Sequence, residues 1–303
     1  MHEEEKKVAT QSPQPASGMQ AFKTGLLMAI PRDRHTFGAL LKTVLFYGGG
    51  WAVLMGLWMV YGPRGAHGSV PLSFHVGGET LSMMTVAMSV MMAFPFIAIF
   101  SVRCVLEHRT NVAYFDTRGP CVFMGAFAAG GIMFPLSFVG DLAFARTPQE
   151  VQLLTLTLSY VVMAYIAMVI VHLVASGRLA LKETWQIFKP SFFMGVLVSG
   201  GTILVLAVAA LLTYGVLVFM VVGGMTLMSF QIGHDPLMVI QDWATLLRGN
   251  GLYRGLLPYD FIILSSLGLL IGLVAWTCAG SFAALASIYS AQKATESSAG
   301  ESK

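Results

Sequence analysis

The feature that most constrains this chain is residues 190–233, a stretch without one charged side chain. As a single helix it would be about 60 Å long, roughly twice the hydrocarbon core of a bilayer. We therefore expect two membrane spans here, joined by a turn at Thr213-Tyr214-Gly215. The other apolar segments should pack around this hairpin.

The composition is that of a membrane protein. The chain of 303 residues is 56% hydrophobic and 11% charged, whereas soluble domains carry about 25% charged residues. We expect one transmembrane helical domain at 21–291, between disordered tails at 1–20 and 292–303. The net charge of +3 is too small to indicate nucleic-acid binding.

Apolar runs predict an all-α, polytopic helix bundle of seven spans, or of six if the central stretch crosses once. Pro95 should kink the second span. Segments 176–189 and 236–247 have the pattern of amphipathic interfacial helices, and Leu179, Leu181, Trp185 and Phe188 should share one face of the former. The expected spans are 37–61, 81–102, 120–140, 152–175, 191–212, 216–232 and 259–289.

The distribution of basic residues predicts the orientation. With the N-terminus in the cytoplasm and seven spans, fourteen of the 18 Lys and Arg residues lie on the inner side, as the positive-inside rule requires. This assignment leaves the C-terminus outside, whereas six spans leave it inside. We therefore predict a multi-pass protein of the bacterial inner membrane, with seven spans preferred.

Two groups of side chains could bind a metal ion. Imidazole, carboxylate and thioether groups suit zinc or copper, but histidines in a glycine-rich loop are a weak pattern, and methionine commonly serves as adaptable packing. We therefore expect no cofactor. The groups are His67, His75 and Glu79 in the first outer loop, and Met84, Met88 and Met92 at helical spacing in the second span.

His172 is the histidine placed well inside a predicted span, and ionisable groups in a membrane are functional candidates. A hydrogen-bonded histidine near the interface is the simpler interpretation. The glycine pairs Gly200-Gly201 and Gly223-Gly224 occupy corresponding positions in the two arms of the central hairpin. They could mark a broken helix or a cavity.

Small residues recur every three or four positions along the last span. Such a stripe lets another helix approach closely. It could serve a partner, a second copy of the chain, or packing within the chain. Its members are Gly268, Gly272, Ala275, Ala279 and Ala283.

Catalytic and transport signatures are missing from the sequence. There is no P-loop, HExxH or GxSxG motif. Ser199 and Ser281 with His172 as base could suggest an intramembrane protease, but small residues at helix contacts explain these serines better. No predicted span has a charged residue at its centre, which disfavours ion-coupled transport.

Part of the pattern resembles a known family. A span is followed by the basic amphipathic SGRLALKETWQIFK, an apolar stretch interrupted by glycines, and then PLMVIQDWATLLRGN. This order, across residues 164–243, is similar to that of YciC-type bacterial inner-membrane proteins, and MMAFPFIAIFSVRCVLEHR and SFAALASIY are loosely similar to segments of related families. The resemblance implies a multi-span helical protein and carries over no site residues.

These observations favour a non-enzymatic protein. We expect a scaffold or accessory subunit that lies in the lipid bilayer and binds lipid, another membrane protein or a second copy. The alternative is a channel or permease for a neutral or weakly polar solute, suggested by the glycine pairs and by prolines within spans.

Overall fold

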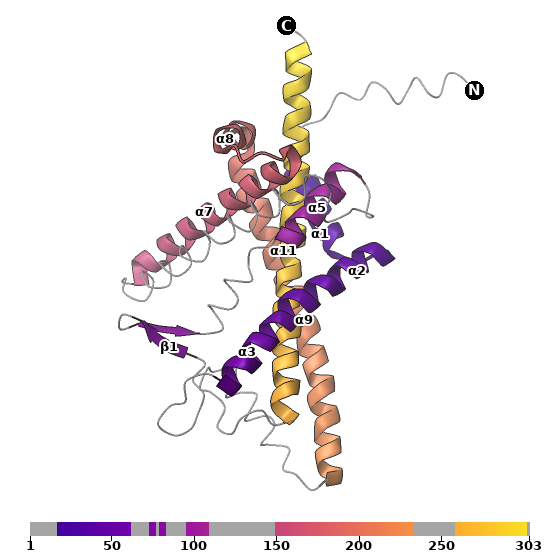
Figure 1. The fold of residues 1–303 in the computed structure, drawn as a ribbon. Coiled ribbons are helices and arrows are strands. Elements are labelled where there is room, and N and C mark those ends of the chain that lie inside the picture. Colours follow the sequence, from indigo (N-terminus) through magenta and orange to yellow (C-terminus); the bar gives the residue numbers. More distant parts are fainter. Residues whose placement is uncertain are drawn as a thin grey trace, which may run out of the picture.

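The computed structural model describes residues 17–61, 73–76, 79–82, 95–108, 149–232 and 258–301. The architecture of this part is helical, as predicted, apart from one short β-hairpin (Figure 1). Within the described ranges, three helical segments are long and apolar enough to cross a membrane: Arg34–Leu54, Leu181–Met220 and Leu264–Thr295.

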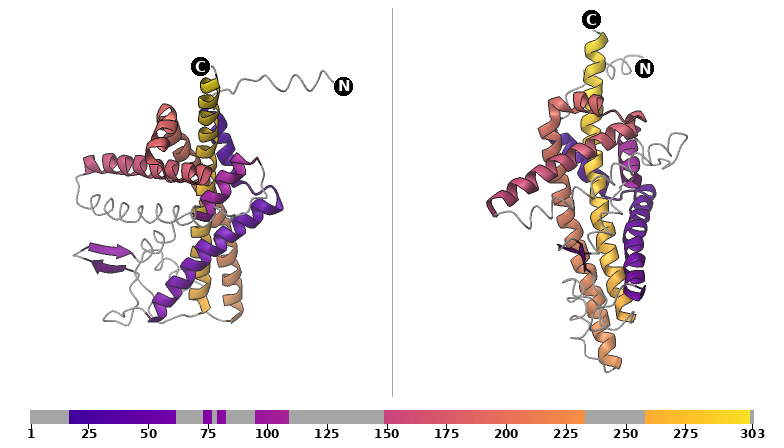
Figure 2. Two further views of the ribbon diagram at one scale, coloured as in Figure 1. Left: turned by 45° about the horizontal axis from the view of Figure 1, so that its top comes forward. Right: turned by 60° about the vertical axis from the view of Figure 1, so that its left-hand side comes forward.

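The last helix, α11 (Pro258–Glu301), is the axis of the described structure. In an 18-residue apolar window of α11, 72% of the residues are buried within the protein, against 11% in the corresponding window of the stretch that contains α9 (Phe192–Ile232). Figure 2 shows α9 running alongside α11 in both views. The helix α11 also continues past residue 291, the expected end of the transmembrane domain, to Glu301.

The N-terminal helices descend along α11 in the opposite direction. Ser17 caps α1 by accepting a hydrogen bond from the backbone N–H of Gln20, and Asp33 caps α2 through a reciprocal capping box with Thr36. The order is α1 (Gly18–Ala29), α2 (Arg34–Thr43), the π-helix η2 (Val44–Gly49) and α3 (Gly50–Tyr61).

Glycines allow the closest approach between these helices and α11. A Cβ atom placed on Gly48 would collide with the carbonyl of Gly268, and one placed on Gly272 would lie 2.6 Å from the Cα of Val44. The two backbones therefore touch at two points that are one helical turn apart, Gly48 with Gly268 and Val44 with Gly272. Gly268 and Gly272 belong to the small-residue stripe, and Gly48 is the first of three consecutive glycines.

The central apolar stretch folds as one helix, so the expected hairpin is wrong. Helix α9 runs unbroken through Thr213-Tyr214-Gly215. The hydroxyl of Thr213 donates to the carbonyl of Ala209 at 2.8 Å, and a single glycine costs a helix only about 1 kcal/mol. Without a proline, nothing in this triplet ends the helix, and the count of seven spans is not supported.

The remaining described elements lie beside this framework. The described part of α5 starts at Pro95. Residues 83–94, which precede it in the predicted second span, lie outside the described residues, so the kink at Pro95 stays a prediction. Ser73 pairs with Ser82 at the open end of the hairpin, and the two glycines between its strands in the sequence are typical of tight hairpin turns. The elements are α5 (Pro95–Leu106), α7 (Gln149–Ser176), α8 (Leu181–Phe188), the 3₁₀-helix η3 (Lys189–Ser191), β1 (Ser73–Val76) and β2 (Glu79–Ser82).

Candidate functional site

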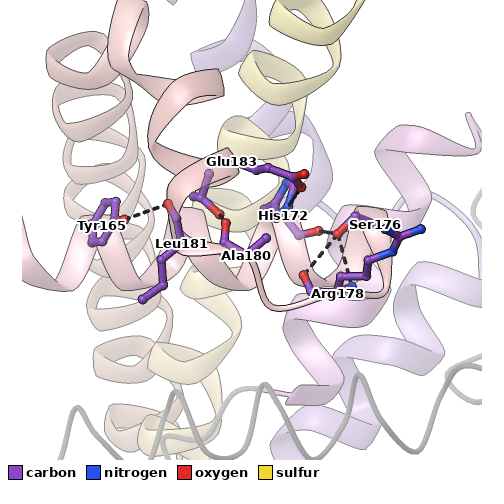
Figure 3. Close-up of polar contacts among 8 residues, drawn as sticks. Tyr165, His172, Ser176, Arg178, Ala180, Leu181 and Glu183 are labelled. Carbon is purple, nitrogen blue, oxygen red and sulfur yellow. Dashed lines mark hydrogen bonds and ion pairs between the residues drawn. The ribbon is translucent and has the colours of Figure 1, made fainter.

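The best-defined polar site surrounds His172, near the end of α7 (Figure 3). The His172 side chain is 3% exposed, and its Nε2 atom lies 3.4 Å from the Oε2 atom of Glu183 on α8. Its ring packs edge-on against Tyr289 of α11, with the ring centroids 5.8 Å apart. Two consecutive helices, α7 and α8, therefore meet α11, which is distant in the sequence, at one histidine.

The turn between α7 and α8 brings the histidine and the carboxylate together. Gly177 has a φ angle of 71° and donates its N–H to the carbonyl of Leu173 at 2.8 Å. This left-handed residue is a common helix terminator. The hydroxyl of Ser176 donates to the carbonyl of His172 at 2.8 Å and accepts from the N–H of Arg178 at 3.2 Å. The turn is thus held by hydrogen bonds among its own backbone groups and the Ser176 hydroxyl.

A second contact fixes the start of α8. Tyr165 donates its hydroxyl to the carbonyl of Leu181 at 3.3 Å, and its ring lies 6.1 Å from that of Trp185. Trp185 also packs edge-on against Phe192 at 5.4 Å. Tyrosine and tryptophan prefer the membrane–water interface, so this aromatic group suits a helix lying at that depth.

The buried face of α8 differs from the predicted one. Thr184, Ile187 and Phe188 are buried, whereas Leu181 is 56% and Trp185 43% exposed. Phe188 therefore belongs to the inner face, and the predicted common face with Leu179, Leu181 and Trp185 is wrong. The inner face forms because residues 184, 187 and 188 follow the three- and four-residue spacing of a helix side.

The chemistry of this corner is limited. Glu183 is 63% exposed and faces the buried ring of His172 at the protein surface. Across the described ranges no group of three or more His, Cys, Asp or Glu side chains could hold a metal ion. The pair can join α7 to α8, and it contains neither a hydroxyl nor a thiol nucleophile.

The two serines considered for a protease do meet. The hydroxyls of Ser199 and Ser281 lie 2.6 Å apart and are buried. Ser281 precedes Tyr289, the neighbour of His172, by about two helical turns, or roughly 12 Å along α11. The histidine is therefore out of reach, and the serine pair joins α9 to α11 as an interhelical hydrogen bond.

The glycine pairs of α9 do not break the helix, so the predicted break is wrong. A Cβ on Gly200 would collide with the Tyr160 side chain, and Gly201 faces Phe22 at 3.5 Å. The hydroxyl of Tyr160 also donates to the carbonyl of Val196 at 2.9 Å. Gly223 and Gly224 have no neighbouring atom within 4 Å among the described residues.

The small-residue stripe of α11 faces helices of the same chain. Gly268 and Gly272 touch η2, as described above, and Ala275, Ala279 and Ala283 are all less than 10% exposed. Gly25 of α1 approaches Gly280, whose carbonyl would lie 2.7 Å from a Cβ on Gly25. Sequence reasoning missed this crossing, although a glycine within a short apolar helix was the available signal.

The predicted metal ligands fall mostly outside the described residues. His67, Met84, Met88 and Met92 are among those not described. His75 pairs with Thr80 across the hairpin and Glu79 pairs with Val76. His75 and Glu79 are therefore not directly opposite each other in the hairpin. Sequence reasoning missed Glu183 as the partner of His172. The available signal was Ser176-Gly177, a pair typical of a helix end, which predicts a sharp turn before the next helix.

Comparison with models of protein families, with curated protein sequences and with solved structures gives no match. The function must therefore be argued from the chain itself.

Proposed function

We propose that this protein is a non-enzymatic scaffold or accessory subunit of the bacterial inner membrane, which binds another membrane protein through the outer half of α9. Lipid covers the rest of its apolar surface. The observation that carries this proposal is the length of uncovered apolar surface on α9.

Large apolar side chains of α9 are exposed along most of its length. Their exposed fractions reach 74% at Leu197, 68% at Leu212 and 80% at Phe219. Helix α9 has 41 residues and is thus about 60 Å long. Tilted by 40°, the upper end of the usual range, it would still extend about 45 Å along the membrane normal, against a hydrocarbon core of about 30 Å.

The excess apolar length needs cover other than lipid. Apolar patches on a protein surface commonly mark interaction sites. The inner end of α9, near α8, lies among basic residues, so its outer half is the part that exceeds the bilayer. A helix of a second membrane protein, or of a complex that this chain joins, would cover it.

The arrangement of helices favours six spans with both ends inside. Helix α9 crosses once, so α11 returns to the side from which α2 starts. Relative to seven spans, Arg248 and Arg254 move outside while Lys293 and Lys303 move inside, and fourteen of the 18 basic residues remain on the inner side. The positive-inside rule is therefore satisfied equally well, and the continuity of α9 supports six spans.

Photo-crosslinking in intact cells tests the partner. A benzophenone side chain at Phe219 should form an adduct with a second protein. The same group at Leu204, 67% exposed and within the bilayer, should react with lipid and serves as the control. The proposal fails if Phe219 gives only lipid adducts or crosslinks within the chain, and the protein purifies as a solitary monomer in mild detergent.

The channel alternative rested on helix breaks at the glycine pairs and on prolines within spans. Since α9 continues through Gly200-Gly201 and Gly223-Gly224, the first support is lost. Pro135 lies outside the described residues, so the second is untested and the channel stays the alternative. The pattern-level resemblance to YciC-type proteins stays a prediction.

A further inference from the structure

A groove lies at the inner end of the helix bundle, between α1, α5 and α11. Its volume is about 470 Å³, within the usual range of small-ligand sites. Helices α1, α5 and α11 gather in the same region in Figure 1. The linker from α1 to α2 closes one side, and His108, just after α5, closes another.

The lining of the groove is amphiphilic. Leu27 and Met28 of α1 and Val105 of α5 contribute apolar surface. The polar lining comes from charged residues, hydroxyls and one amide at the other positions. These are Gln20, Thr24, Arg32, Asp33, Thr36, His108, Ser287 and Ser290.

Most of the polar groups are already engaged within the chain. The Thr24 hydroxyl donates to the carbonyl of Gln20 at 3.0 Å, and the Ser290 hydroxyl donates to the carbonyl of Ser287 at 3.0 Å. The Oδ1 atom of Asp33 accepts hydrogen bonds from two backbone N–H groups at the start of α2, which offset its charge.

The Arg32 guanidinium and the His108 ring have no partner among the described residues. Arg32 engages these residues through its backbone N–H, at 3.1 Å from the hydroxyl of Thr36. His108 has a φ angle of 50°, the left-handed region that is uncommon for residues other than glycine. Neighbouring Arg103 is paired with Glu107 at 2.8 Å, whereas Arg32 is the arginine of the described groove lining and has no ion pair with a described residue.

We propose that this groove binds the phosphodiester headgroup of a phospholipid from the inner leaflet. The Arg32 guanidinium and the His108 imidazole donate hydrogen bonds to the phosphate oxygens, since a guanidinium matches the geometry of a phosphate. The apolar side of the groove receives the first part of the acyl chains, which continue into the bilayer. The groove is at the opposite end of the bundle from the outer half of α9, so this inference does not depend on a protein partner.

Titration of delipidated protein in detergent tests the site, with a short-chain phosphatidylglycerol as one ligand and inorganic phosphate as the other. One phosphatidylglycerol should bind per chain, with much weaker binding of inorganic phosphate. Arg32→Gln should weaken lipid binding about tenfold, the usual effect of losing one charge-assisted hydrogen bond.

Two further variants separate the groove from general charge and from misfolding. Arg34→Gln removes a cation two residues away that does not line the groove, and binding should stay within about twofold of the original. His108→Asn keeps a residue that tolerates the left-handed conformation and should weaken binding as Arg32→Gln does. Equal binding of inorganic phosphate, no binding of either ligand, or equal losses in the Arg32 and Arg34 variants would each overturn the proposal.

Discussion

The contact between Gly272 and Val44 gives the sharpest test of the packing. In Gly272→Ala the new Cβ would lie 2.6 Å from the Cα and 3.1 Å from the carbonyl oxygen of Val44. Both are backbone atoms, so the helices must separate. Overpacking of this kind costs up to about 3 kcal/mol, while replacing glycine in a helix returns about 1 kcal/mol. The free energy of unfolding should therefore fall by about 2 kcal/mol.

Gly215→Ala is the matched control. It lies in α9 and has no neighbouring atom within 4 Å among the described residues. The same change there should raise the free energy of unfolding by up to about 1 kcal/mol through helix propensity alone. Reversible unfolding in mixed micelles, followed by tryptophan fluorescence, measures both. If Gly272→Ala stabilises the protein as Gly215→Ala does, α2–α3 does not pack on α11 as described.

Three other changes test separate contacts. Trp276→Phe removes a buried hydrogen bond of 2.8 Å from the indole N–H to the last carbonyl of α1; it should lower the free energy of unfolding by about 1–2 kcal/mol, and an unchanged unfolding midpoint would contradict the docking of α1. Ser199→Ala leaves Ser281 without its interhelical partner and should cost about 0.6–1.7 kcal/mol in the same unfolding assay; a gain in stability would show that the pair is not formed. In a variant without native cysteines, single cysteines at Lys182 and Ser297 should react with a membrane-impermeant reagent from the same, cytoplasmic side of vesicles, and labelling from opposite sides would exclude six spans.

Composition and apolar run length predicted a helical membrane protein, and the helices at residues 34–61 and 149–176 lie where expected. The central stretch was predicted wrongly because length was treated as decisive. An apolar helix longer than the bilayer is unfavourable only if lipid is its sole environment. The count of basic residues could not correct the error, because both topologies place the same number of them inside. Six spans move Arg248 and Arg254 outside and bring Lys293 and Lys303 inside.

The site was predicted only in part. The position of His172 within an apolar run identified a buried histidine, but its carboxylate partner depends on how sharply α7 ends at Gly177. The glycine run at 48–50 and the stripe at Gly268 and Gly272 were each recognisable in the sequence. That they face one another is a tertiary property, set by the antiparallel course of α2–α3 and α11, which spacing along one helix cannot reveal.

The central place of α11 has a consequence for biogenesis. It is the last of the described helices to leave the ribosome, yet α1, η2, α5 and α9 all pack against it. Until it enters the membrane, Gly48 lacks the Gly268 backbone against which it packs, and none of the contacts of the earlier helices with α11 can form. Synthesis of residues 258–301 is thus the step at which the inserted segments can assemble around α11.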